Sequence, residues 1–304
     1  MAESRLLRAN ALLLLASAIW GFAFVAQRVG ADYVGPLTFN AVRFAMGAVV
    51  LIAVIMVLDR HRGLSKAKRS AATRKVIGPG LACGVLLGAA VGFQQASMPE
   101  ASAGDAAFVT ALYIVIVPLF GLFFGRRMGW QLVVGVAACV VGMYLICVTD
   151  DLVLGPSDLL LLASATVFAI QIMLVDHYTN RVSALRFAAA QFVSCAAVSA
   201  IAAFFVDAAP FSGLEQAVVP LLYGGVGSVG IAYTLQVLGQ RDALASHAAL
   251  IMSLEAVFGW LGGMIFLGEK MALRGYIGAV LMVAGILVSQ LGTLTHPKQE
   301  APGG

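Results

Sequence analysis

The feature that most constrains this chain is a series of apolar segments, each long enough to cross a lipid bilayer. A membrane-spanning α-helix needs about 20 mainly apolar residues. Ten segments satisfy this rule, near residues 9–29, 35–58, 76–98, 102–124, 130–149, 157–176, 184–206, 217–239, 244–267 and 272–293. Because lipid offers backbone groups no hydrogen bonds, we expect each segment to be helical.

Composition excludes the soluble alternatives. The 304 residues are 61% apolar and only 11% charged, whereas soluble domains carry about 45–50% apolar and about 25% charged residues. Lipid must therefore be the solvent for most of the surface. The net charge of +4 does not indicate a nucleic-acid partner, because the basic residues lie in short loops and not on one amphipathic face.

The cysteines indicate neither a metal site nor a disulfide framework. All four lie inside apolar segments, at Cys83, Cys139, Cys147 and Cys195. No two of them have CxxC spacing, and no loop carries a Cys–His cluster. We expect them to be small buried hydrophobic side chains. The chain is accordingly predicted to need no metal and no cofactor.

The distribution of charge predicts the orientation in the membrane. If the N-terminus is cytoplasmic, most of the 19 Lys and Arg residues lie on the cytoplasmic side, including a cluster between Arg60 and Lys75. Basic residues favour cytoplasmic loops. The opposite loops are acidic, with Asp32, Glu100, Asp150, Asp151, Asp207 and Glu215. Both termini are therefore predicted to be cytoplasmic.

Two halves of the chain resemble each other. The sequence LLLLASA occurs at residues 12–18 and again at 159–165, an offset of 147 residues. Further similarities recur at an offset of 143 residues: RFA at 43 and 186, FGRRM at 124 with LGEKM at 267, and glycines at 135 with 278 and 142 with 285. We predict two homologous units over residues 1–150 and 151–295, followed by a disordered cytoplasmic tail over 296–304.

An odd number of segments in each unit decides the architecture. A unit of five helices that starts inside ends outside, so the second unit must run in the opposite direction. The predicted fold is an all-α polytopic membrane protein with ten transmembrane helices as two inverted five-helix repeats. Inverted repeats are typical of secondary transporters, with the substrate site near the midplane between the repeats. Such a pair can open to either side with similar energy, as alternating access requires.

The order of several motifs carries a family resemblance over nearly the whole chain. With SAIWGFAFVAQR at 17–28, NAVRF at 40–44 and LGEKM at 267–271, the chain resembles the EamA branch of the drug/metabolite transporter superfamily. It is similar to YddG-type bacterial amino-acid exporters. It departs from the family pattern at Ala256, where Pro often follows a Glu, and at Arg126, where the second half has Glu269.

The resemblance implies a multi-pass protein of the bacterial inner membrane that exports amino acids or related metabolites. Drugs or other metabolites are the alternative substrates. A small-molecule substrate and the lipid bilayer are the expected partners, and we expect a monomer, with a dimer as the alternative.

Polar and aromatic side chains within the apolar segments indicate where a substrate binds. Trp20, Phe24 and Gln27 follow i, i+4, i+7 spacing and share one face of the first predicted helix. Amides supply donors and acceptors and rings cover apolar parts, which suits a zwitterion or a small amphipathic solute. The alternative is that each polar group only bridges neighbouring helices. The predicted substrate-binding residues are Trp20, Phe24, Gln94, Tyr113, Phe168, Gln171, Tyr233, Gln236 and Glu255.

Glu255 lies near the middle of the ninth predicted helix. An ionised carboxylate at the bilayer centre costs on the order of 2.5–3.5 kcal/mol, so it must be protonated, paired or in contact with water. We interpret it as a contact for a substrate amine or as a protonation site that couples transport to protons. The alternative is a structural partner of His247 or of a helix terminus.

Arg43 lies about 10 Å from the outer end of the second predicted helix at 1.5 Å per residue. It could reach the interface by snorkelling, and its recurrence as Arg186 favours a structural role. A strip of glycines at 80, 84, 88 and 92 predicts close helix packing, with gating as the alternative. Pro118 is expected to kink the fourth helix.

Other functional classes fit the sequence poorly. The chain has no HExxH or GxSxG motif and no paired Asp in facing segments, which argues against an intramembrane enzyme. Its loops are too short to hold the domain that a receptor or scaffold requires. We therefore predict a protein without catalytic residues.

Overall fold

The computed structural model describes residues 2–123, 125, 128–147, 156–179, 181–268 and 273–295. Side chains are described for the same residues except 2–4, 105, 146–147 and 290–295. The tail at 296–304 and the boundary between residues 150 and 151 lie outside these ranges, as do Arg126, Asp150, Asp151 and Glu269.

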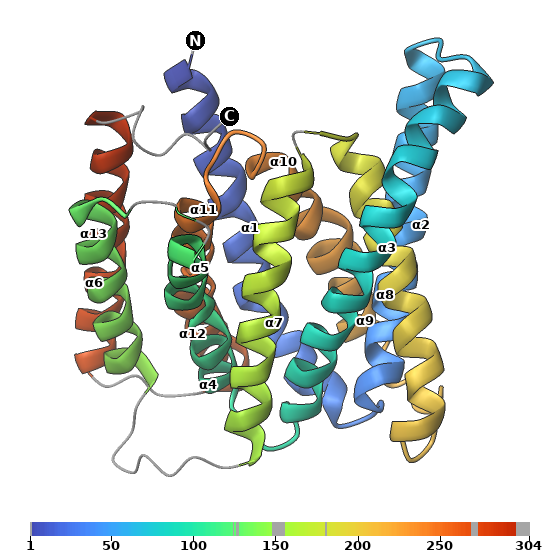
Figure 1. The fold of residues 1–304 in the computed structure, drawn as a ribbon. Helices are drawn as coiled ribbons and strands as arrows, with labels where there is room; N and C mark the ends of the chain where they lie inside the picture. The colour runs from blue at the N-terminus through green and yellow to red at the C-terminus, as the bar shows by residue number, and fades with distance from the viewer. Residues whose placement is uncertain are drawn as a thin grey trace.

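The described residues form helices that correspond to the ten predicted segments (Figure 1). The first half contains α1 (Ala2–Ala31), α2 (Pro36–His61), α3 (Lys66–Ser97), α4 (Ala103–Ala111), α5 (Tyr113–Phe123) and α6 (Trp130–Cys147). The second half contains α7 (Pro156–Thr179), α8 (Ala184–Val206), α9 (Val218–Leu222), η1 (Tyr223–Tyr233), α10 (Thr234–Gly239), α11 (Ala245–Met252), α12 (Glu255–Leu267) and α13 (Leu273–Thr295).

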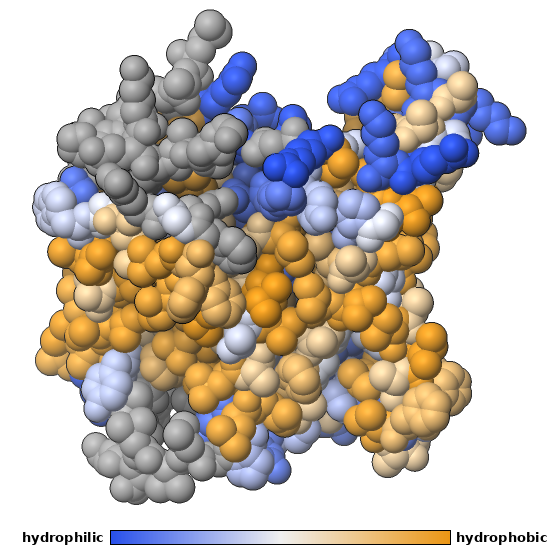
Figure 2. Space-filling model, viewed as in Figure 1, coloured by the Kyte–Doolittle hydropathy of each residue, from blue (hydrophilic) through white to orange (hydrophobic). Residues whose placement is uncertain are grey.

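Large apolar side chains face outward around the bundle. Phe123 and Phe205 are 86% and 85% exposed, and Figure 2 shows an apolar belt across the molecule with hydrophilic residues above it. Within the described residues, eight helical segments are long and apolar enough to span a membrane, accompanied by shorter apolar helices at Trp130–Leu145 and Leu273–Ser289. The predicted class of polytopic membrane protein is confirmed.

The packing of α6 against α13 agrees with the predicted inverted repeat. A Cβ on Gly135 would lie 2.7 Å from the backbone oxygen of Gly285, and one on Gly142 would lie 2.5 Å from that of Gly278. At the 143-residue offset Gly135 corresponds to Gly278 and Gly142 to Gly285. The predicted symmetry therefore exchanges these two contacts, as it must when a helix packs against its own inverted counterpart.

A second pair of corresponding helices, α2 and α8, is joined at both ends by carboxylates. Asp207, directly after α8, accepts hydrogen bonds from the backbone N–H groups of Leu37 (3.2 Å) and Thr38 (2.7 Å) at the start of α2. Asp59 near the end of α2 accepts two bonds of 2.7 and 2.6 Å from Arg186 at the start of α8. The structural role expected for Arg186 fits this position.

The glycine strip on α3 packs closely against α8. A Cβ on Gly84 would lie 2.5 Å from the backbone oxygen of Gln191, and one on Gly80 would lie 2.5 Å from the Cβ of Ala190. Both helices therefore need small residues at their contact, which supports the packing interpretation for Gly80 and Gly84.

Three of the ten segments are interrupted, which the sequence analysis did not predict. The fourth breaks at Leu112, the ninth breaks at Ser253 and Leu254, and the eighth contains the π-helix η1. Pro118 lies inside α5 and not at the break. A proline lacks an N–H and its ring clashes with the carbonyl four residues earlier, so distortion is expected on its N-terminal side.

The hydrophilic hairpin formed by the end of α2 and the start of α3 projects from one side of the bundle. Figure 1 shows α1 beginning and α13 ending on the side where the hairpin of α2 and α3 projects, and this hairpin is hydrophilic in Figure 2. The basic cluster from Arg60 to Lys75 lies in that hairpin.

Candidate functional site

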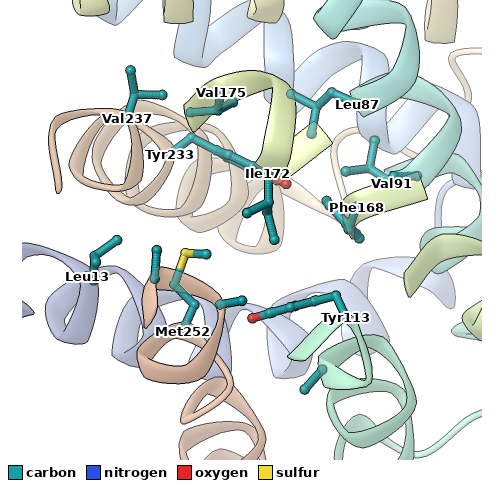
Figure 3. Close-up of a cluster of buried hydrophobic side chains, with 14 of the residues drawn as sticks. Leu13, Leu87, Val91, Tyr113, Phe168, Ile172, Val175, Tyr233, Val237 and Met252 are labelled. Atoms are coloured by element: carbon teal, nitrogen blue, oxygen red, sulfur yellow. The ribbon is translucent and has the colours of Figure 1, made fainter. Parts of the chain in front are cut away.

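A cavity lies inside the bundle, between helices of both repeats. Figure 3 shows Phe168, Ile172 and Tyr233 on one side and Tyr113 and Met252 on the other. The lining side chains come from every membrane segment except the fifth, seventh and tenth; they are Trp20, Phe24, Gln27, Arg43, Gln94, Thr110, Tyr113, Phe168, Ile172, Ser228, Tyr233, Gln236, Met252 and Glu255.

The cavity is narrow. Its volume is about 30 Å³. A larger solute therefore requires the surrounding side chains or helices to move apart.

The predicted face of α1 forms one wall. Trp20, Phe24 and Gln27 all line the cavity. The indole Nε1 of Trp20 donates to the backbone oxygen of Ser228 (3.2 Å), and its ring packs against Tyr233 with 4.6 Å between centroids. These contacts join α1 to the π-helix η1.

Of the nine predicted substrate-binding side chains, only Gln171 does not line the cavity. Its Nε2 donates to Oε1 of Gln191 on α8 (3.1 Å). Each residue advances a helix by about 100°, so Gln171 and Ile172 point about 100° apart, on either side of Phe168. The cavity lies on the side of Ile172, which the sequence analysis did not single out.

Glu255 is the first residue of α12, directly after the break in the ninth segment, and is 4% exposed. Its Oε1 accepts a hydrogen bond from the hydroxyl of Tyr113 (2.9 Å), the first residue of α5. The two helix breaks thus meet at the cavity, and the N-terminus of α12 favours a negative charge there. The structural alternative named His247 or a helix terminus, and Glu255 does lie at a helix terminus; the ring of His247 contacts Ser289 Oγ at 3.1 Å.

Arg43 does not snorkel to the interface. It is 2% exposed and lines the cavity. Its Nε donates to Oδ1 of Asn40 (2.8 Å), and its guanidinium lies 5.5 Å from the ring centre of Phe39 and 5.3 Å from that of Phe44. Asn40 is itself held by a bond to the backbone oxygen of Val91 (2.8 Å). These contacts direct the arginine inward.

Comparison with known proteins gives the family. The EamA-like transporter family matches the chain over residues 7–148 and again over residues 155–291. The chain belongs to the EamA-like transporter family. The resemblance to the EamA family noted from the sequence motifs is confirmed.

Relatives of this EamA-like protein carry names of the same kind. An uncharacterized transporter of Archaeoglobus fulgidus is 26% identical over 280 residues, which cover 92% of this chain and 84% of that protein. The uncharacterized transporter YoaV of Bacillus subtilis is 23% identical over 280 residues, which cover 89% of this chain and 92% of that protein. A solved crystal structure with 20% identity has a TM-score of 0.75 and covers 93% of this chain and 96% of its own, which shows a shared fold.

Two amide oxygens in the cavity of this EamA-like transporter have no hydrogen-bond partner among the described residues. They are Oε1 of Gln27 and Oε1 of Gln236, on side chains that are 3% and 1% exposed. Gln94 differs, because its Nε2 donates to Thr110 Oγ1 (3.3 Å). The cavity therefore retains acceptor capacity that the protein itself does not use.

The lining residues that sequence reasoning missed come from packing between distant segments. Thr110, Ile172 and Met252 have no distinctive spacing, and Ser228 reaches the cavity through the π-helix η1. Four glycines in the sequence YGGVGSVGIAY were the available signal for an irregular helix. Within the described chain, no group of three or more His, Cys, Asp or Glu is placed to hold a metal ion.

Proposed function

We propose that this EamA-like transporter exports amino acids or related small metabolites across a bacterial inner membrane. The observation that carries the proposal is the cavity itself, in which a cation, Arg43, and an acid, Glu255, line the same space as several aromatic rings. Such a lining complements a solute with both charges and an apolar part. Export of drugs or other metabolites is the alternative, which the rings of Trp20, Phe24 and Phe168 support.

Alternating access is the proposed mechanism. The two proposed units, residues 1–150 and 151–295, surround the cavity and run in opposite directions, so opening toward either side involves equivalent movements. The narrowness of the cavity supports a cycle in which helices part to admit the solute and close around it. Both termini are proposed to be cytoplasmic, because the basic hairpin lies on their side.

Proteoliposomes that contain the purified full chain test the function. We expect uptake or efflux of at least one labelled amino acid from a broad panel, and we expect that amino acid to raise the unfolding temperature of the protein. If no amino acid moves and none stabilises the protein, the proposal is overturned. Movement of drugs alone would favour the alternative.

Proton coupling is tested by repeating the assay with and without a pH gradient. If Glu255 couples transport to protons, the gradient accelerates the wild type, and Glu255→Gln abolishes that acceleration. Glu100→Gln is the matched control, since Glu100 is an exposed loop residue outside the cavity. Unchanged transport in Glu255→Gln would remove Glu255 from the mechanism.

A further inference from the structure

We propose that Arg43 forms the carboxylate subsite of the cavity. Its two terminal guanidinium nitrogens donate to the carboxylate of the solute, while Glu255 and the free amide oxygens of Gln27 and Gln236 receive the ammonium group. This inference rests on the proposed function and adds to it the direction in which an amino acid binds.

The first argument is that the protein provides Arg43 with no anion. A guanidinium carries five N–H donors and keeps its charge in proteins. Its Nε binds Asn40, but within the described residues nothing accepts from its terminal nitrogens and no ion pair joins it to a carboxylate. A buried charge without a partner is costly, so an anion that enters the cavity offsets that cost.

The second argument is that Arg43 is held in position before a solute arrives. Asn40 fixes one edge of the guanidinium through Nε, and the rings of Phe39 and Phe44 lie beside it. The remaining edge carries two parallel donors, which match the two oxygens of a carboxylate.

The third argument comes from the other repeat. Arg186, the counterpart of Arg43, binds both oxygens of Asp59 at 2.7 and 2.6 Å. At the 143-residue offset the position that corresponds to Asp59 is Ala202. The arginine is present in both repeats, but its acidic partner is present in only one, and the arginine without a partner lines the cavity.

The ammonium group of the solute has its own acceptors in the cavity wall. An ammonium group has three donors, and Glu255 with the two free amide oxygens of Gln27 and Gln236 supplies acceptors from α12, α1 and α10. The rings of Trp20 and Tyr233 cover the apolar part. The cavity is therefore suited to a free α-amino acid and poorly suited to a solute with its carboxylate removed.

The test compares three probes on the full chain in detergent and in proteoliposomes. They are an amino acid that the wild type transports, its methyl ester, and the amine that lacks the carboxylate. We expect the wild type to bind the amino acid at least tenfold more tightly than the methyl ester. Equal binding of the two would overturn the proposal without the use of any variant.

The variants Arg43→Gln and Arg43→Lys then assign the effect to the residue. We expect Arg43→Gln to weaken binding of the amino acid at least tenfold and to leave binding of the amine unchanged, with Arg43→Lys in between. Arg28→Gln is the matched control, because Arg28 pairs with Asp32 outside the cavity.

Two outcomes distinguish failure of the Arg43 subsite from failure of the proposed function. If Arg43→Gln weakens the amine as much as the amino acid, or weakens neither, while the wild type transports amino acids, the subsite is wrong and the proposed function stands. If the wild type neither binds nor transports any amino acid, the proposed function and this subsite both fail.

Discussion

Hydrogen-bonding capacity is distributed unevenly among the side chains of the cavity. The indole of Trp20 and the amide of Gln94 have partners on neighbouring helices, so these groups help to hold the wall together. Glu255 has a single hydrogen-bonding partner among the described residues, the hydroxyl of Tyr113. Because that bond joins α12 to α5 across two helix breaks, it both orients the acid and connects the repeats.

Tyr113→Phe tests this bond while keeping the ring. Interhelical hydrogen bonds in membranes contribute about 0.6 kcal/mol on average, so we expect a small decrease in unfolding temperature. We expect a decrease of about tenfold in the initial transport rate in proteoliposomes, because Glu255 loses its orientation. Tyr276→Phe, on an exposed side chain of α13, is the control. Equal rates for both variants would show that the bond has no role in transport.

Every interrupted segment of this fold contributes to the cavity wall together with the continuous helices α1, α2, α3 and α7, whereas one helix pair does not. The continuous helices α6 and α13 pack closely through glycines and contribute no residue to the cavity. The interrupted segments, α4 with α5, η1, and α11 with α12, all contribute lining residues. Breaks in transmembrane helices are tolerated where the backbone lines a cavity, which explains why the irregular elements gather at the candidate site.

Gly142→Leu tests the supporting pair. A Cβ at this position already approaches the backbone oxygen of Gly278 to 2.5 Å, so the larger side chain must force α6 away from α13. Overpacking of this kind costs about 1–3 kcal/mol, and we expect a lower unfolding temperature with transport by the folded fraction retained. Gly78→Leu is the control, since no heavy atom lies within 4 Å of a Cβ there. Similar unfolding temperatures for the two variants would contradict the close packing.

At the scale of the whole molecule, the apolar surface and the distribution of charge predict how the protein is oriented in the membrane. The apolar belt in Figure 2 fits the hydrocarbon of a bilayer, and the basic hairpin of α2 and α3 lies beyond the belt on one side. Basic loops are retained in the cytoplasm during insertion. The side that holds this hairpin is therefore expected to be cytoplasmic.

Single cysteines test this orientation in a chain whose native cysteines are replaced. Ser70→Cys lies in the basic hairpin of α2 and α3. Ser212→Cys lies in the loop after the C-terminal end of α8, and both positions are exposed. With a membrane-impermeant maleimide, we expect labelling at 212 in intact cells and at 70 only after permeabilisation. The reverse pattern would invert the topology and place both termini outside.

The sequence predicted most of the side chains that line the cavity, because periodicity along one helix locates its polar face. The spacing of Trp20, Phe24 and Gln27 was sufficient for α1. It was insufficient for Gln171, which hydrogen-bonds Gln191 on α8. A polar helix face can contact either the cavity or a neighbouring helix, and spacing along one helix does not distinguish the two. It was also insufficient for Arg43, since the choice between interface and interior depends on Asn40, which the backbone oxygen of Val91 on α3 holds in place.

The sequence by itself determined the ten spans and predicted the inverted repeat, because transfer into lipid depends on local composition and a repeat is a comparison within the chain. Only the tertiary structure decided where helices break, which polar faces converge, and that Arg43 and Glu255 share one cavity. Those features arise from contacts between segments that are far apart in the chain. Their energies exist only once the helices have packed.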